Sequence, residues 1–525
     1  MTTTTWNSAA AGTMHRPHTG SRSVAFDLAR RSAVPWLVLL CSVQAALALR
    51  AGYNSNAFDD EGLYIYMGHR VIHHLLTGAA LREVPGSYFS GSPSLYPVLA
   101  AMADSLGGLQ AARGVSLFFA MLATVGTYGV GARLYGRAAG LLGAAAFVVC
   151  GPVIYQSHLA VYDSTMMGLV AVAAWLAVRD AQLHRMLWAP AIGALLTLAS
   201  FVKYAGLVYA PLVAILAAVV AWPNLRWVAA RRAAVMMAAV TATFFFTLQL
   251  WGRDLIPGIE HTTLERKVIT PSSATQLTIQ VATWVGPWLL LAVIGAALRP
   301  RREWAQSLVL LAAAVVGPLQ QIRIGEAVSL SKHVAFGMVF AAPLVGSLLA
   351  ALLRRGWRTV PAVAMVLGIL AQIGVPDAQR FLTGWLDDRD LRPILTRVVA
   401  AQPGRPILGE QPSPQRYELR TLTDPRQWFD TYEFSYDGLS GRPAYARAID
   451  AGYFGVIYLS ITTDYGAYVH NYLTYLSHQN TYRLTAKVPR YLRGEVVGHW
   501  LIYTEVADAS SGRGKRAELI AGGAR

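Results

Sequence analysis

The chain has 525 residues, of which 54% are hydrophobic and 14% are charged, and its formal net charge is +16. This composition is too apolar for a water-soluble enzyme of that length and indicates an integral membrane protein. The excess of positive charge does not indicate nucleic-acid binding, because most of it falls in short connections between apolar stretches, where it can face anionic lipid headgroups. Cys41 and Cys150 both lie inside apolar stretches, which excludes a disulfide framework and a cysteine-based metal site.

Eleven apolar stretches predict a mostly α-helical, polytopic bundle of about eleven spanning helices, since most approach the ~20 residues that cross a bilayer. The first 30 residues contain no apolar core, so we predict no cleavable signal peptide and expect the first helix to direct insertion. The stretches cover residues 33–49, 111–132, 139–156, 165–178, 187–202, 206–222, 233–251, 281–298, 304–322, 333–353 and 359–373.

Arginine clusters fall in alternate connections and therefore predict the sidedness of the chain. The positive-inside rule places these connections in the cytoplasm. The N-terminal tail, residues 1–32, is then cytoplasmic, and the C-terminal region is outside. The clusters comprise Arg30 and Arg31; Arg133 and Arg137; Arg179 and Arg185; Arg226, Arg231 and Arg232; Arg299, Arg301 and Arg302; and Arg354, Arg355 and Arg358.

The outer connections are long, which is typical of functional loops. A membrane module is expected at 33–375, with outer loops at 50–110, 252–280 and 323–332. The first loop should hold two short helices at the membrane surface, Leu63–Thr77 and Ser94–Leu106. Residues 376–507 are expected to form an extracytoplasmic α/β domain, and 508–525 a disordered tail. In that domain we predict helices at 390–401 and 443–451, and strands at 406–409, 456–460, 482–486 and 500–503.

Three consecutive carboxylates, Asp59, Asp60 and Glu61, follow the first apolar stretch on its outer side. They could cap the first surface helix, because acidic residues favour a helix N-terminus. Alternatively, one carboxylate acts as a general base toward an acceptor, or a pair holds a divalent metal ion through oxygen ligands. The sequence leaves these roles open.

A fourth carboxylate, Asp163, is predicted at the same outer side, between the third and fourth stretches. A single aspartate there is commonly a helix cap, but its approach to the first-loop carboxylates favours a functional role. His158 lies nearby and is either a ligand or proton carrier, or an interfacial histidine bonded to the backbone. If a metal ion binds, the candidate ligands are Glu61, His158 and Asp163.

Cations on the outer side oppose the cytoplasmic bias of the other basic residues. A lysine that extends from a helix end to the interface requires no function. Beside carboxylates, however, such cations suit a phosphate or pyrophosphate carried on a lipid, because that anion lies at headgroup depth. The candidates are Lys203, Lys332 and His333 at helix ends, and Arg253, Arg266 and Lys267 in the second outer loop.

The order of these residues resembles the GT-C class of membrane glycosyltransferases, in particular the bacterial group related to protein O-mannosyltransferases and lipid A aminoarabinose transferases. The pattern covers roughly residues 30–375. In addition to the carboxylates, Lys203, and the Lys332-His333 pair, it includes a Pro-Ser-Leu-Tyr-Pro sequence at 93–97, Arg113, and Pro343. The family has Pro-Pro-Leu-Tyr where this chain has Pro-Ser-Leu-Tyr, and an arginine where this chain has Lys332.

The resemblance implies transfer of a sugar, commonly with inversion, from a polyprenyl-phosphate donor to an acceptor on the outer face. No nucleotide sugar is used, and metal dependence varies among related enzymes. It implies Asp60 as the general base, with Asp59 as the alternative, and assigns Asp163 to orienting the base, the acceptor or a metal. Lys203, Lys332 and His333 would lie near the donor phosphate, with Arg253 or Arg266 able to substitute.

Two other classes of protein fit parts of the pattern. A transporter or flippase for lipid-linked sugars would carry ionisable residues or broken helices near the bilayer midplane. Here the acidic residues collect instead at the outer boundary. A non-catalytic envelope-assembly protein would use the C-terminal domain for binding and would tolerate loss of the carboxylates. The identities of the sugar and the acceptor depend on loop side chains, which a sequence pattern does not specify.

Overall fold

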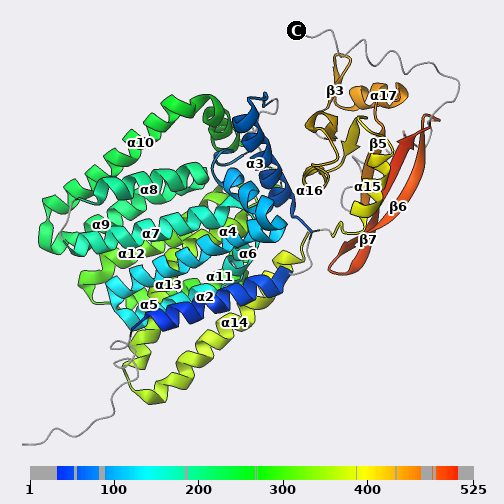
Figure 1. Cartoon of the computed structure of the whole chain (residues 1–525). Helices are drawn as coiled ribbons and strands as arrows, with labels where there is room; N and C mark the ends of the chain where they lie inside the picture. The colour runs from blue at the N-terminus through cyan, green and yellow to red at the C-terminus, as the bar shows by residue number, and fades with distance from the viewer. Residues whose placement is uncertain are drawn as a thin grey trace, which may run out of the picture.

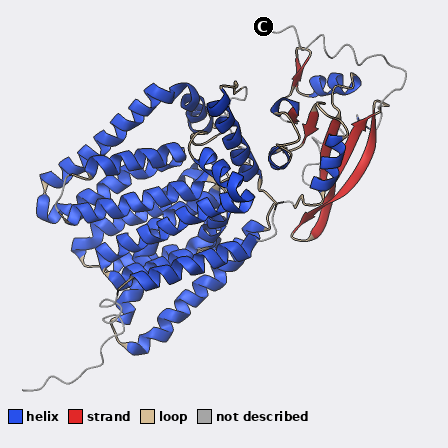
Figure 2. Ribbon diagram, in the orientation of Figure 1, coloured by secondary structure: helices blue, strands red, loops and turns tan. Residues whose placement is uncertain are grey.

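The computed structural model consists of a helical bundle and a smaller C-terminal unit that contains the β-sheet (Figure 1). Colouring by secondary structure separates the two, because the strands occur in the C-terminal unit (Figure 2). The structure describes residues 32–52, 56–81, 89–183, 187–266, 268, 270–385, 387–431, 434–462, 476 and 480–506. Of the predicted cytoplasmic tail, residues 1–32, only residue 32 is described. The predicted disordered tail at 508–525 lies outside the described residues.

Eight helices of the described chain, taken with adjoining short turns, are long and apolar enough to cross a membrane. The predicted class, a polytopic helical bundle, is therefore confirmed. These helices are α4 (Tyr96–Tyr135), α7 (Tyr162–Gln182), α9 (Tyr209–Leu225), α10 (Trp227–Ile259), α11 (Ala274–Ala297), α12 (Trp304–Ile324), α13 (Leu330–Leu353) and α14 (Val360–Leu382).

The other three predicted stretches are shorter or broken. The first and fifth form the apolar helices α2 (Val34–Gly52) and α8 (Ala189–Val202). The third is divided into α5 (Arg137–Val148) and α6 (Gly151–His158), which are bent by 69°. Proline explains the division, since Pro152 has no backbone N–H to donate to the Val148 carbonyl and its ring would clash with that carbonyl in a continuous helix.

The connections that are predicted to lie on the outer side contain more helix than the sequence predicts. The first surface helix, α3 (Asp59–Thr77), begins before residue 63 and includes the acidic residues in its first turn, where negative charge is favourable. The segment predicted as the second surface helix is continuous with α4 and is separated from the span by non-helical backbone at Gly107 and Gly108. The connection predicted at 252–280 is partly helical, because α10 continues to Ile259 and a π-helical turn, Glu260–Leu264, follows it.

The C-terminal unit is a mixed five-stranded sheet with the order β2-β1-β5-β7-β6. Strand β1 pairs in parallel with β2 and β5, whereas β7 pairs antiparallel with β5 and β6. The strands are β1 (Ile407–Gly409), β2 (Trp428–Asp430), β5 (Val456–Thr462), β6 (Tyr482–Leu492) and β7 (Glu495–Glu505), with a small hairpin of β3 (Ser435–Tyr436) and β4 (Leu439–Ser440). Helices α15 (Leu391–Ala400) and α17 (Arg442–Asp450) occupy the predicted helical segments.

Several features of this unit differ from the prediction. Strands β6 and β7 extend beyond the segments predicted at 482–486 and 500–503. The sequence underestimates the length of β6 because much of that strand is exposed and carries no continuous apolar pattern. Strand β2 and the short helix α16 (Ser413–Glu418) were not predicted. Pro376, where the apolar pattern stops, lies inside α14.

Helix α16 joins the C-terminal unit to the membrane module by packing on α3. A Cβ atom on Gly62 would lie 2.7 Å from the Ser413 carbonyl oxygen, so the two backbones touch. The buried Asp104 carboxylate of α4 accepts hydrogen bonds from Tyr417 (2.5 Å) and Arg420 (2.7 Å) and lies 2.7 Å from His69 Nε2. These contacts fix the C-terminal unit beside the first turn of α3.

The arginine distribution predicts that the C-terminal unit is external and that the connection after α9 is cytoplasmic. In a variant without the two native cysteines, an impermeant thiol reagent should label Ser440→Cys in intact cells and should not label Asn224→Cys. Both positions are exposed, so accessibility from one side of the membrane decides the result. After permeabilisation both should react, and labelling of Asn224→Cys alone in intact cells would reverse the topology.

Candidate active site

The three consecutive carboxylates at the start of α3 point into different surroundings. Asp60 Oδ2 lies 2.5 Å from Lys332 Nζ, and 28% of the Asp60 side chain is exposed. Glu61 is fully buried, and Asp59 faces α16 of the C-terminal unit. Adjacent helical residues point about 100° apart, which explains why one short acidic run serves three environments.

Glu61 holds three segments together. Arg113 donates to it bidentately, from Nε at 2.8 Å and Nη2 at 2.7 Å, and the backbone N–H groups of Phe58 and Ala160 donate at 2.8 and 2.7 Å. Burial opposes ionisation, but Arg113 and these backbone donors together lower the pKa of Glu61 below its usual value. Because these bonds occupy both carboxylate oxygens, the geometry makes Glu61 a positioning residue.

Asp60 is the outermost member of a chain of alternating charges, which also contains Lys332, Asp163 and Lys203. Lys332 Nζ bonds to Asp60 and lies 3.7 Å from Asp163 Oδ2, while Lys203 Nζ lies 2.9 Å from Asp163 Oδ1. Asp163 is fully buried, and the two lysine side chains are 4% and 8% exposed. The tertiary structure therefore brings together four of the predicted site residues, from α3, α7, α13 and the C-terminal end of α8.

Aromatic rings line the inner end of this chain of charges. Lys203 Nζ lies 4.6 Å from the ring centroid of Tyr162, whose ring stacks on Tyr64 at 4.4 Å. The Tyr162 hydroxyl is also 2.6 Å from Ser90 Oγ. A cation over an aromatic face is stabilised by the ring quadrupole, so Tyr162 helps to hold Lys203 in place.

The segment before α4 supports Lys203 through its backbone. Ser92 donates to the Phe201 carbonyl at 2.7 Å, and Tyr204 donates to the Ser90 carbonyl at 2.8 Å. A Cβ atom on Gly91 would lie 2.0 Å from the Val202 carbonyl oxygen, so this close approach requires glycine. The loop that ends in the Pro-Ser-Leu-Tyr-Pro sequence thus fixes the end of α8.

Asp59 lies against the C-terminal unit. Burial and the neighbouring charge of Asp60 raise the pKa of Asp59 to about 6, against the opposing hydrogen bond from Ser413. Its Oδ1 atom is buried without a hydrogen-bond partner among the described residues. A poorly solvated carboxyl of this kind contacts the docked unit, whereas Asp60 remains open to solvent.

Two other predicted candidates, His333 and His158, bond to backbone carbonyl groups. His333 is buried, with Nδ1 2.9 Å from the Ser329 carbonyl oxygen and the ring beside Gln321. His158 Nδ1 is 3.0 Å from the Ala48 carbonyl oxygen, which fits the backbone-bonded alternative. Of the candidates in the predicted second outer loop, Arg253 is exposed on α10 and Arg266 is half-buried. Lys267 lies outside the described residues.

The proposed metal ligands are not assembled. Among the residues that the structure describes, no group of three or more His, Cys, Asp or Glu side chains is arranged to hold a metal ion. Glu61 is occupied by Arg113, Asp163 by the two lysines, and His158 by a backbone carbonyl. These residues do not fit a common divalent metal site, so no step of the proposed reaction is assigned to a metal ion.

The sequence predicts no role for Tyr162 or Ser90, and it indicates Arg113 only as a position in the family pattern. The position of Tyr162 next to Asp163 is the one feature of the sequence that could have indicated a role for Tyr162. Ser90 contacts Tyr162, which lies 72 residues away in the sequence, and no local sequence pattern reveals such a contact.

The structure thus combines a polytopic helical bundle with a buried cluster of alternating carboxylates and lysines. The fold is that of the GT-C membrane glycosyltransferases, as predicted. No family model matches the chain, and no curated protein sequence matches it. The similarity that follows is therefore structural.

The structure is similar to ArnT from Cupriavidus metallidurans bound to undecaprenyl phosphate, with a TM-score of 0.62 and 15% identity over 91% of this chain and 99% of ArnT. It is also similar to an oligosaccharyltransferase from Archaeoglobus fulgidus, with a TM-score of 0.57 and 12% identity over 84% of this chain and 71% of that chain. The mycobacterial arabinofuranosyltransferase AftD gives a TM-score of 0.52 and 15% identity over 91% of this chain and 42% of AftD. At these identities, the comparisons show a common fold.

Proposed function

We propose that this protein is a membrane glycosyltransferase that transfers a sugar from a polyprenyl-phosphate donor to a cell-envelope acceptor at the outer boundary of the membrane. The observation that carries the proposal is the partly exposed Asp60 carboxylate at the most accessible end of a buried chain of alternating charges. A base must reach its substrate, and Asp60 is more exposed than Asp163 or either lysine. Structural similarity to ArnT bound to undecaprenyl phosphate supports the donor class.

In the proposed reaction, Asp60 accepts the proton of an acceptor hydroxyl or amine as that atom attacks the anomeric carbon of the donor. The new glycosidic bond forms while the bond between the anomeric carbon and the phosphate oxygen breaks. Polyprenyl phosphate leaves with the bonding electron pair, and attack from the opposite face inverts the anomeric configuration. Asp163 orients Lys203 and Lys332 through the contacts that surround it.

The two lysines are proposed to neutralise the donor phosphate. Lys332 is paired with Asp60 in this structure, so phosphate binding to Lys332 would free the Asp60 carboxylate to accept a proton. This exchange couples donor binding to activation of the base. Lysine neutralises phosphate as a point charge, in contrast to the bidentate contact of arginine.

Replacement of either lysine by alanine is expected to weaken donor binding. A charge-assisted contact contributes about 1.5–3 kcal/mol, or roughly ten-fold to more than one hundred-fold in affinity. Titration of the purified protein with a polyprenyl-phosphate sugar measures the change in Lys203→Ala and Lys332→Ala. The matched control is Lys487→Ala, which removes an exposed lysine from β6.

Both lysines are buried, so each variant also requires a thermal-stability measurement to separate lost binding from misfolding. Donor affinity unchanged in both folded variants would remove the lysines from the donor site. The sugar and acceptor are to be identified by mass spectrometry of envelope glycans from cells with and without the protein. Loss of one glycan species should be reversed by the wild-type chain.

A further inference from the structure

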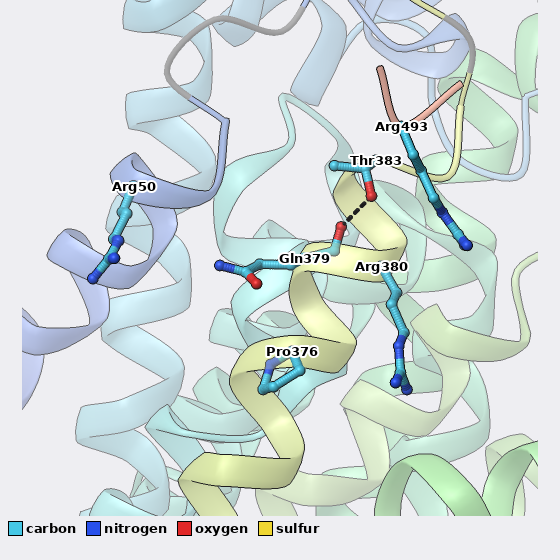
Figure 3. Close-up of a pocket in the computed structure, with 6 residues that line it drawn as sticks. All are labelled: Arg50, Pro376, Gln379, Arg380, Thr383 and Arg493. Atoms are coloured by element: carbon cyan, nitrogen blue, oxygen red, sulfur yellow. Dashed lines mark hydrogen bonds between the residues drawn. The ribbon is translucent and has the colours of Figure 1, made fainter. Parts of the chain in front are cut away.

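A polar pocket lies at the C-terminal ends of α2 and α14, beside the turn that joins β6 to β7. Its volume is about 440 Å³. In Figure 3 the Arg380 and Arg493 side chains extend in the same direction, and the Gln379 amide points from α14 toward Arg50. The lining residues are Arg50, Pro376, Gln379, Arg380, Thr383 and Arg493.

The pocket has an excess of positive charge. Arg380 Nη1 lies 3.0 Å from Asp377 Oδ1, while no carboxylate partner is found for Arg50 or Arg493 among the described residues. Arg50 and Arg380 lie in the last turns of their helices, where the helix dipole favours cations. The dipole accounts for these two residues individually, but it does not account for Arg493.

Arg493 occupies an unfavourable backbone position. It lies in the two-residue turn between the paired residues Leu492 and Glu495, with a φ of 54°, and Gly494 follows with a φ of 85°. Such hairpin turns favour Asn, Asp or Gly at both positions, because a side chain with a positive φ is crowded. An arginine at such a position points to a role for its side chain.

The turn is held beside α14 by the backbone. Asp387, just after α14, forms an isolated antiparallel bridge with Tyr491 and donates to its carbonyl oxygen at 2.8 Å. This bridge places the Arg493 turn against the end of the membrane helix. The C-terminal unit thus contributes a cation to a pocket whose other walls are membrane helices.

The depth of the pocket suits a lipid headgroup. Further down α14, Ile369 and Met365 are 51% and 62% exposed, as expected for side chains that face lipid. Ile369 lies near the middle of α14, and Arg380 lies about 16 Å beyond it toward the C-terminal end of the helix, at 1.5 Å per residue. That rise is close to the thickness of one hydrocarbon leaflet, which is about 15 Å.

We propose that this pocket binds the phosphate group of a phosphorylated lipid in the outer leaflet, with the lipid chains lying along α14. Arg380 and Arg493 supply planar guanidinium groups that match phosphate oxygens, and Gln379 and Thr383 supply further polar groups. None of the lining residues belongs to the chain of charges around Asp60. The pocket is therefore a phosphate site distinct from the proposed donor site.

The pocket is tested by native mass spectrometry of the full-length protein, in detergent micelles that contain phosphatidic acid. Wild-type protein should retain phosphatidic acid in preference to diacylglycerol, which has the same chains without the phosphate. Arg380→Ala combined with Arg493→Gly should weaken retention by about ten-fold or more, as expected for loss of charge-assisted contacts. Glycine suits the positive φ of residue 493, so the second substitution preserves the turn.

The matched control combines Arg397→Ala with Arg442→Ala, which removes two exposed arginines elsewhere in the C-terminal unit and should leave retention unchanged. Asp60→Asn should also bind phosphatidic acid normally, so this result is separable from the proposed transfer reaction. Equal retention by the pocket variant and the wild type would overturn the proposal. Equal retention of diacylglycerol, or competition by inorganic phosphate at equimolar concentration, would likewise refute a site for phosphorylated lipid.

Discussion

Asp60→Asn is expected to abolish sugar transfer while the protein stays folded and able to bind its lipid donor. Asparagine preserves the size of the side chain but removes the negative charge and the capacity to accept a proton. A general base contributes about 10²- to 10⁴-fold to the rate, so the loss should be at least in this range. The measurement is the release of polyprenyl phosphate from a labelled donor in proteoliposomes supplied with membrane extract from cells that lack the protein.

Neighbouring carboxylates supply the comparisons for this experiment. Asp59→Asn should have a milder effect, because Asp59 faces α16 rather than the open end of the charge cluster. Asp163→Asn should fall between the two, since it disturbs both lysines without removing the base. Asp390→Asn, at an exposed position in the C-terminal unit, is the matched control and should be fully active.

The outcomes distinguish the classes of function. An inactive Asp59→Asn together with an active Asp60→Asn would move the base by one residue. Activity in both variants would exclude this acidic run from catalysis and would favour the transporter or assembly-protein alternatives. Donor binding measured in parallel identifies a variant that is inactive only because it has lost the donor.

Arg113→Ala should cause the largest loss of stability among single substitutions near the site. It leaves the Glu61 carboxylate fully buried without its bidentate partner. Breaking a buried ion pair by removing one member costs about 3–5 kcal/mol. Thermal unfolding of the detergent-solubilised protein measures this loss, and Arg113→Lys should lose less because it retains the charge.

The pH dependence provides a second measurement for this pair. The pKa of Glu61 is lowered in the folded protein, so its ionised form adds stability that is present above its unfolded pKa, near 4.5. That contribution is lost as the pH falls through the folded pKa. The difference in stability between wild type and Arg113→Ala should therefore narrow on acidification below about pH 4.5. An equally stable Arg113→Ala protein at neutral pH would contradict the structural role assigned to Glu61.

The sequence alone determined the class of protein, and it predicts the side of the membrane on which the site lies. Apolar stretches that approach the length of a bilayer span can be recognised without any knowledge of tertiary contacts. Each of them lies in a helix or in a bent pair of helices. The GT-C fold was also predictable from ordered short motifs. Helix breaks were less predictable, because the bend at Pro152 and the continuation of α4 past Gly107 depend on packing as well as composition.

Only the tertiary structure decided which charges meet. Asp60 and Lys332 are 272 residues apart, and Glu61 and Arg113 are 52 apart, so no local pattern specifies either pair. From sequence alone, the same run of three carboxylates could supply a base, an ion pair or a helix cap. Packing decides between these roles, because it buries Glu61 and leaves Asp60 partly exposed. Burial sets the electrostatic cost of each charge, and burial is a property of the assembled helices rather than of the residues themselves.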